Sequence, residues 1–300
     1  MPGKGSIFMS NNPYSSPQWE QHHILPHAYT FHPYDENEVT RLLLRHRQLS
    51  ECMGGILPAS LDLTQVKRVL DANCGVGGWV YDLAWRYPSM QVMGFDGDSF
   101  FVEQAQAFVA GLGNAVVIEQ DIHHLSDEVL PPASFDVVHA RFLVSEVLPQ
   151  EYPAVIPSLV RLCRAGGMFV WEEIEFPITN SRACQQIFTV VQNGLKALGR
   201  AFVPGHALGI TVLMGSWLRA SGCKIAVDKA YSIDVSAGTK GHEAFARQMW
   251  VFGKQISSLL LESHVTTAEA FEELCKQAQQ EIVNAGFCGI CYLRTLVGVR

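Results

Sequence analysis

A glycine-rich turn with an acidic residue before it and no lysine after it occupies residues 71–78, DANCGVGG. Asp71, Asn73, Gly75 and Gly77 give it the form D-x-N-x-G-x-G-G. Glycines let a ligand approach bare backbone, and a following helix offers unpaired N–H groups. The missing Lys-Ser or Lys-Thr pair excludes a P-loop phosphotransfer site. The charge of Asp71 would repel a pyrophosphate and attract a cation, which favours a ligand with an ammonium or sulfonium group.

Two further acidic residues follow strand-like segments. Asp96 lies near the end of VMGFDGD, residues 92–98, and 25 residues after Asp71, where a carboxylate can accept both hydroxyls of a ribose. The alternative is that Asp96 and Gly97 only form a turn. Asp121 closes IEQDI and could accept from the exocyclic amine of adenine while Ile122 covers the ring, with a helix N-cap or loop acid as the alternative.

Strands and helices alternate around these residues. Short β-rich runs separated by helical runs of 10–15 residues predict βαβ crossovers and a parallel sheet covered on both faces, which is a doubly wound α/β domain. Strands are expected at residues 67–74, 91–98, 115–122, 135–142 and 168–176, and helices at 77–88, 101–113 and 151–167.

The two ends of the chain differ from this central part. An apolar spacing typical of a helix runs from Glu36 to Met53, and Gly54-Gly55 should stop it. The last third predicts strands at 224–236 and 288–300 that pair with each other, with helices before and between them. We therefore expect an N-terminal arm and helix, acting as a lid, at residues 1–58. A domain at 59–300 would carry helical cap insertions at about 180–222 and 240–286.

Composition restricts the partners and the location. A formal charge of −7 and a pI near 5.9 argue against a protein that holds nucleic acid through its phosphates. The longest basic stretch, RLLLRHR at residues 41–47, is interpreted as an amphipathic helix with a solvated basic face, with an anion site as the alternative. Without a long apolar run or a signal-peptide core, no membrane span and a cytoplasmic location are expected.

The eight cysteines do not form a metal-binding pattern. CGIC, residues 288–291, has a suggestive spacing but no second cysteine pair or nearby histidine pair. We expect reduced, buried thiols and no metal.

These features together resemble the class I S-adenosylmethionine-dependent methyltransferases, in particular the small-molecule branch with ubiquinone/menaquinone-type enzymes. The resemblance covers about residues 66–176, and more loosely the strands after 223. The turn at 71–78 matches the family's D-x-G-x-G-x-G loop, with Asn73 in place of a glycine. SFDVVHARF (134–142) resembles the fourth-strand motif. LCRAGGMFVWEE (162–173) resembles the L-K-P-G-G turn before the fifth strand, with Ala165 in place of proline.

The resemblance implies a Rossmann-like, seven-stranded, mostly parallel sheet and S-adenosylmethionine as cofactor. It makes Asp96 the ribose acid and Asp121-Ile122 the adenine pair. The residues expected to bind the cofactor are Asp71, Asn73, Gly75, Gly77, Asp96, Gly97, Asp121, Ile122, Ala140 and Arg141.

Methyl transfer from a sulfonium is an in-line displacement, so positioning supplies much of the rate, and a base is needed only if the acceptor loses a proton. The catalytic candidates are Glu173, His139 and His206. In WEEIE, residues 171–175, strand alternation places Glu173 and Glu175 on the same side and Glu172 on the other. We expect Glu173 to line the substrate side, with a structural hydrogen bond as the alternative.

Helices beside the strand ends are expected to roof an apolar acceptor pocket. Aromatic residues could line it, with core packing as the alternative: Tyr29, Phe31, Tyr34, Trp171, Phe176, Phe202, Trp217 and Trp250. Residues 1–28 read as a flexible arm, and removing the arm through Tyr34 should weaken turnover and keep the fold. The arm could instead pack against the domain or against a second subunit of a homo-oligomer.

The expected function is transfer of a methyl group to a small, apolar metabolite, as in secondary metabolite biosynthesis. The alternative is a protein that binds S-adenosylmethionine without transferring methyl, as a cyclase or as a regulatory or assembly partner.

Overall fold

The computed structural model of the protein describes residues 36–300, and a sheet lies at its centre. Within these residues the sheet has eight strands in the order β3-β2-β1-β4-β5-β8-β6, and β7 pairs with β8 beside this path. Strands β1 to β5 pair in parallel, and β8 runs antiparallel to β5, β6 and β7. The strand bounds are β1 Arg68–Ala72, β2 Gln91–Asp96, β3 Ala115–Glu119, β4 Phe135–Arg141, β5 Cys163–Ile174, β6 Ile178–Thr179, β7 Lys224–Asp234 and β8 Gly289–Val299.

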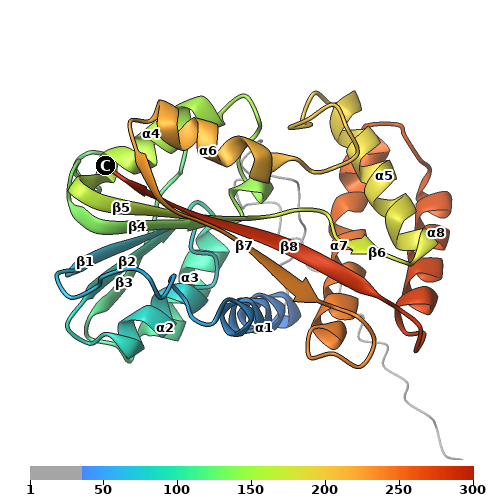
Figure 1. The fold of residues 1–300 in the computed structure, drawn as a ribbon, viewed down its shortest axis with the longest axis horizontal. Coiled ribbons are helices and arrows are strands. Elements are labelled where there is room, and N and C mark those ends of the chain that lie inside the picture. The colour runs from blue at the N-terminus through green and yellow to red at the C-terminus, as the bar shows by residue number, and fades with distance from the viewer. Residues whose placement is uncertain (1–35) are drawn as a thin grey trace, which may run out of the picture.

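Helices cover both faces of the sheet and one of its ends. In Figure 1, α1, α2 and α3 lie on one side, α4 and α6 lie on the other, and α5, α7 and α8 gather beyond the end of β5. The helix bounds are α1 Glu36–Met53, α2 Gly78–Arg86, α3 Ser99–Val109, α4 Tyr152–Leu162, α5 Arg182–Ala197, α6 Ile210–Ala220, α7 His242–Glu262 and α8 Ala268–Ile282. A short 3-10 helix, η2, spans Leu143–Ser145 after β4.

The strands are apolar on both sides because both faces are buried. Val69 and Val137, paired between β1 and β4, pack in the core that includes Trp79 of α2. The next pair, Leu70 and Val138, points to the opposite face and packs in the larger core. Such continuous burial is typical of parallel strands.

Helix α1 is attached to the cap through polar side chains. Glu38 and Arg41 of α1 pair with each other, and Arg41 also donates to Gln248 of α7. Gln255 of α7 donates to Glu38 at 3.1 Å. These contacts hold the N-terminal helix against the cap helix that follows it by about 200 residues.

The predicted fold class is confirmed, with two differences of detail. The sheet has one strand more than the seven predicted, because the two-residue β6 also pairs with β8. The helix predicted over 151–167 is too long, because the backbone becomes extended at Cys163 and β5 begins there.

The helix predicted between Glu36 and Met53 is confirmed as α1, and the late strands β7 and β8 pair as predicted. The division into a lid at residues 1–58 and a domain at 59–300 stays a prediction. Within residues 36–300, none of the helices combines the length and apolar character that crossing a bilayer requires.

Glycine is required at residue 77 for packing as well as for backbone conformation. Gly77 has φ 75° and is the N-cap of α2. A Cβ placed there would lie 2.9 Å from the Cβ of Ala105 in α3. Gly75 also has a positive φ, 54°, but no atom lies within 4 Å of its Cβ position. The turn therefore packs tightly at Gly77 and is open at Gly75.

We predict that Gly75→Ala lowers the free energy of unfolding by about 1–2 kcal/mol, through left-handed backbone strain alone. Gly77→Ala should cost about 1–3 kcal/mol more, because the new methyl group overpacks against Ala105. Urea denaturation of the protein without cofactor measures both variants. Equal losses in the two variants would contradict the packing role of Gly77.

Candidate functional site

The turn after β1 is held against the end of β2 by Asp96. One carboxylate oxygen of Asp96 accepts from the Gly75 amide at 2.8 Å, and the other accepts from the Asp98 amide at 3.0 Å. Burial raises the pKa of Asp96 to about 6, although these amide hydrogen bonds oppose the shift. Asp96 is therefore mostly ionised at pH 7, and each oxygen has a lone pair left for a further donor.

The turn itself adopts the conformation that its sequence suggests. Asn73 has φ 59°, the left-handed region that asparagine tolerates better than most residues. The open space at Gly75, beside the Asp96 carboxylate, is a cradle of bare backbone at the point where the strand order reverses. These residues fit a ligand that carries a pair of hydroxyl groups.

Asp71 is engaged within the protein, and its role toward a cofactor stays a prediction. Its side chain is buried and lies 2.7 Å from Nδ1 of His139, its neighbour across the β1–β4 pair. The indole of Trp79 stacks on the imidazole of His139 with ring centres 4.1 Å apart. The first acid of the motif is therefore used to hold β4 against β1.

His139 lies between two carboxylates, which favour its protonated form. Burial alone would lower the pKa of His139, but Asp71 and Glu172 outweigh it and raise the pKa above its ordinary value. Glu172 of β5 lies 3.6 Å from Nε2 of His139 and 3.8 Å from Nη1 of Arg141. Burial would raise the pKa of Glu172, and these two cations lower it instead.

The charge chain continues from Arg141 to helix α1. Arg141 donates from Nη2 to Nδ1 of His46 at 2.8 Å, and Nε2 of His46 lies 3.0 Å from Asp82 of α2. Burial lowers the pKa of His46, and a ring that accepts at Nδ1 and donates at Nε2 is the neutral tautomer. The chain from Asp71 to Asp82 thus joins β1, β4, β5, α1 and α2. Sequence analysis missed His46, although it stands in the basic stretch at 41–47.

Glu173 lies in the core, which corrects the expectation that it lines the substrate side. Its side chain is 0% exposed and accepts from Nε1 of Trp171 at 2.9 Å. Burial raises the pKa of Glu173 to about 8, so the carboxyl is mostly protonated at pH 7. It is not among the residues that line the cap pocket described below.

Asp121, which follows the third strand, contacts residues next to it in the sequence. The carboxylate of Asp121 accepts from the amide of His123 at 2.8 Å and lies 2.8 Å from Nδ1 of His124. Ile122 is buried in the larger core. The adenine role of the pair is untested and stays a prediction.

The other predicted residues divide between the strand ends and the surface. Ala140 is buried near the end of β4, and Gly97 is half-buried between Asp96 and Asp98. His206 is exposed on the loop before α6 and does not line the cap pocket. Glu175 does line it, but its carboxylate accepts from the amides of Gly209 and Thr211 at the start of α6.

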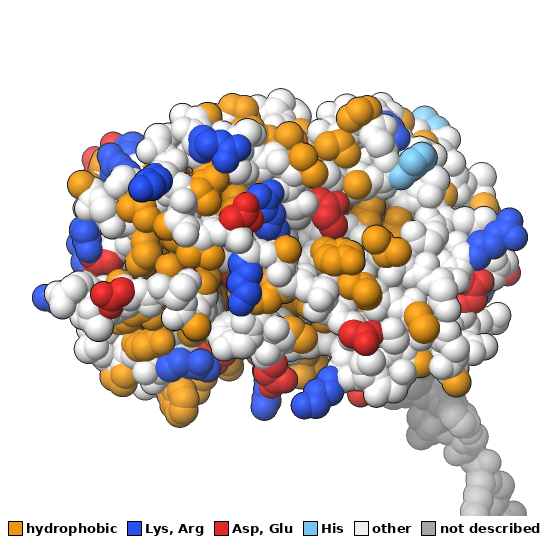
Figure 2. Space-filling view, in the orientation of Figure 1, with side chains coloured by type: hydrophobic (Ala, Val, Ile, Leu, Met, Phe, Trp, Pro, Cys, Tyr) orange, Lys and Arg blue, Asp and Glu red, His pale blue; other side chains and the backbone are white. Residues whose placement is uncertain are grey.

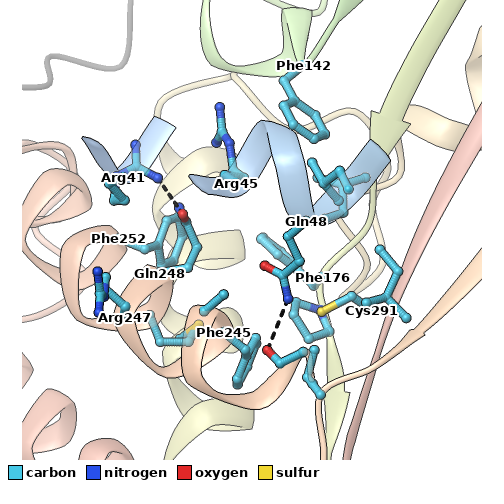
Figure 3. A pocket seen from close by; sticks show the side chains of 18 of the residues that line it. Arg41, Arg45, Gln48, Phe142, Phe176, Phe245, Arg247, Gln248, Phe252 and Cys291 are labelled. Atoms are coloured by element: carbon cyan, nitrogen blue, oxygen red, sulfur yellow. Dashed lines mark hydrogen bonds between the residues drawn. The ribbon is translucent and has the colours of Figure 1, made fainter. Parts of the chain in front are cut away.

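A cavity of about 590 Å³, which we call the cap pocket, opens beyond the ends of β4 and β5 (Figure 3). Its wall comes from α1, the β4–η2 segment, the β5–β6 connection, α5, β7, α7 and β8. The aromatic members of the wall are Phe142, Phe176, Phe188, Phe245 and Phe252.

Of the aromatic residues predicted to line such a pocket, Phe176 does. Trp171, Phe202 and Trp217 instead surround Tyr152 in an aromatic cluster, and Trp250 is 46% exposed. Tyr29, Phe31 and Tyr34 lie outside the described residues, as does the rest of the arm.

Glu146 is a further acidic residue that sequence analysis missed. It follows η2, beside the pocket residue Ser145. Burial, reinforced by the charge of Asp96, raises the pKa of Glu146 to about 7. Its place four residues after the fourth-strand motif, which ends at Phe142, is the signal that could have identified it.

Comparison with known proteins gives a domain assignment for the central part of the chain. Residues 69–167 match the family model described as "Methyltransferase domain". Methyltransferase str3 of Strobilurus tenacellus is 30% identical over 139 residues, which cover 46% of each protein. Secondary metabolism regulator laeA of Coprinopsis cinerea is 29% identical over 153 residues, 49% of this chain and 36% of that protein. The chain thus spans less than half the length of these two relatives.

A solved structure agrees with the fold. The putative methyltransferase from Bacillus halodurans C-125 superposes with a TM-score of 0.50 at 14% identity, covering 85% of this chain and 97% of that one. Such a likeness shows the fold, and the sequence match covers the segment that forms the turn, the strand ends and Asp96. Residues 69–167 therefore match a methyltransferase domain.

Proposed function

We propose that the protein transfers a methyl group from S-adenosylmethionine to a small, apolar metabolite bound in the cap pocket. The observation that carries this proposal is the position of the pocket. Its wall includes Phe142, Val144 and Ser145, which directly follow β4 and so adjoin the cofactor side of the sheet. An apolar cavity of this size next to a donor site suits a drug-sized acceptor.

On the cofactor side, the chain supplies a preformed cradle. Asp96 would accept the ribose hydroxyls, and the bare backbone at Gly75 would contact the ligand, with Asn73, Gly77 and Gly97 shaping the turn. When bound, S-adenosylmethionine supplies an electrophilic methyl group on a sulfonium. The cap residues would exclude water and hold the acceptor in line with that group.

Burial and the charge of Asp96 raise the pKa of Glu146 to about 7, but Glu146 is not among the residues that line the cap pocket. Glu173 is held protonated in the core, and His139 is occupied by Asp71 and Glu172. We therefore assign His139 a positioning role and assign no general base. A role for the exposed His206 stays a prediction.

A role in secondary metabolism is supported by the similarity to a protein named Secondary metabolism regulator laeA. The ubiquinone/menaquinone-type branch stays a prediction. On the face in Figure 2, Lys and Arg side chains alternate with Asp and Glu, which supports a small acceptor over nucleic acid.

A second candidate is a regulatory protein that binds the cofactor without transferring methyl. The similarity to a protein named as a secondary metabolism regulator favours it. Formation of S-adenosylhomocysteine separates the two functions, since only the transferase produces it in step with a methylated acceptor.

We predict that Asp96→Asn weakens binding of S-adenosylmethionine about 10-fold to 100-fold, because the substitution removes a charged acceptor. Calorimetry on the full chain measures the affinity. Asp98→Asn is the matched control, since asparagine also caps α3 in place of the Asp98 side chain. Unchanged affinity in Asp96→Asn would remove the ribose assignment.

Filling the cap pocket should separate turnover from cofactor binding. With isotope-labelled cofactor and a panel of apolar metabolites, we expect the unmodified protein to form S-adenosylhomocysteine and a labelled product in equal amounts. Ala244 of α7 lines the pocket, and Ala244→Phe should lower this turnover at least about 10-fold while leaving cofactor affinity intact.

Ala270→Phe, at an exposed position of α8, is the control and should turn over normally. Full turnover by Ala244→Phe would place the acceptor elsewhere. Cofactor binding without S-adenosylhomocysteine from any acceptor in the panel would favour the regulatory candidate.

The buried carboxyl of Glu173 should make stability depend on pH. Its pKa of about 8 in the folded protein exceeds the ordinary 4.5, so folding is penalised once the group ionises. The neutral carboxyl contributes its full stability below pH 4.5, and this contribution to the free energy of unfolding is lost as the pH rises toward 8. We predict that the free energy of unfolding falls between pH 5 and pH 9 in both proteins, and that the fall is about 1–3 kcal/mol smaller in Glu173→Gln than in the parent. Denaturant titrations at both pH values test this, and parallel losses in the two proteins would contradict it.

A further inference from the structure

The basic stretch of α1 contributes to the wall of the cap pocket. Arg41, Arg45 and Arg47 all line the pocket, and Figure 3 shows Arg41 and Arg45 on successive turns of the helix. The expectation of a fully solvated basic face is therefore wrong for this stretch, because Arg41 is 6% exposed and lies against α7.

Two of these three arginines have a carboxylate partner. Arg41 pairs with Glu38, and Nε of Arg47 lies 3.3 Å from Glu51. Among residues 36–300, no carboxylate forms an ion pair with Arg45. Its guanidinium instead lies over the ring of Phe142, 4.7 Å from the ring centre.

The surroundings of Arg45 are apolar and positively charged. Burial, together with the neighbouring charges of Arg41 and Arg141, lowers the pKa of Arg45 to about 9, and Glu38 offsets only part of this. Arg45 is thus still a cation at pH 7. A half-buried cation without a counter-ion is costly, and an anion brought beside it would offset that cost.

Each acidic residue of the pocket wall already has a partner in an ion pair or a hydrogen bond. Glu51 is close to Arg47, Glu243 accepts from Arg247, and Glu175 accepts from the start of α6. The wall holds more cations than acids: Arg41, Arg45, Arg47, Lys240 and Arg247 against Glu51, Glu175 and Glu243. The pocket thus combines aromatic walls with an unmatched positive charge at the end near β4.

We propose that Arg45 and the ring of Phe142 form a carboxylate-binding subsite of the cap pocket, so that the acceptor is an apolar acid. This inference rests on the proposed function and names its substrate class. An arginine fork pairs with a carboxylate through two parallel hydrogen bonds, while the phenylalanines bury the rest of the molecule. The carboxylate would hold the acceptor at the pocket end nearest the cofactor.

A matched pair of probes tests the subsite without turnover. 2-Naphthoate and its neutral analogue 2-naphthamide are titrated into the full chain at pH 7, without cofactor, and binding is followed by calorimetry. We expect 2-naphthoate to bind at least about 10-fold more tightly than 2-naphthamide. Arg45→Gln should abolish this preference, and Lys276→Gln, at an exposed position of α8 outside the pocket wall, should keep it.

Three outcomes would overturn the proposal: equal affinity for the two probes, binding of neither probe, or an unchanged preference in Arg45→Gln. If Arg45→Gln does not fold, as judged by its thermal melting, Arg45→Lys replaces it and should retain a reduced preference for 2-naphthoate.

A second titration separates the two sources of a carboxylate, since S-adenosylmethionine also carries one. Arg45→Gln should bind S-adenosylmethionine with the parental affinity. A loss of cofactor affinity with unchanged binding of 2-naphthoate would assign Arg45 to the cofactor and overturn the proposal. Because the naphthoate arm needs neither cofactor nor turnover, its failure is distinct from failure of the proposed function.

Discussion

The hydrogen bond between Asp71 and His139 joins β1 to β4 inside the sheet, where neither side chain reaches solvent. Buried charges are tolerated when they are paired. Glu172 on β5 lies 3.6 Å from the other side of the imidazole, and Arg141 lies 3.8 Å from Glu172. Losing one member would leave a neighbouring charge buried and unpaired. The chain of contacts therefore joins β1, β4 and β5 at the point where the turn after β1 begins.

The same chain of contacts determines where the cap lies. Arg141 donates to His46, and His46 holds α1 against α2, so the helix that walls the pocket is anchored to the cofactor side of the sheet. Glu38 and Arg41 then attach α1 to α7. The wall of the pocket and the turn after β1 are thus linked through α1, and the proposed methyl transfer is a reaction in which positioning supplies much of the rate.

Local signals predicted the parts of the fold that depend on nearby residues. Helix α1 was predictable because its apolar spacing ends at two glycines, and the parallel strands were predictable because they are apolar on both faces. The boundary between α4 and β5 was misplaced, since the apolar pattern continues through Leu162 and Cys163 without a clear break.

Contacts between distant residues were not predictable. Asp71 and His139 are 68 residues apart, and only the strand register brings them together. Strand alternation gives the side on which Glu173 lies but not its depth, which depends on Trp171 and the segment after β4. The basic face of α1 was expected in solvent, because nothing local indicates that α7 covers it.

The central claim is that S-adenosylmethionine lies across the ends of β1 and β2 with its sulfur toward the cap pocket. A crystal structure of the full chain with S-adenosylhomocysteine tests this claim most directly. The account predicts that the ribose hydroxyls bond to Asp96, that the ligand contacts the backbone at Gly75, and that the sulfur faces the opening beside Phe142 and Ser145. A ribose bound away from Asp96, or a sulfur turned away from the cap pocket, would contradict it.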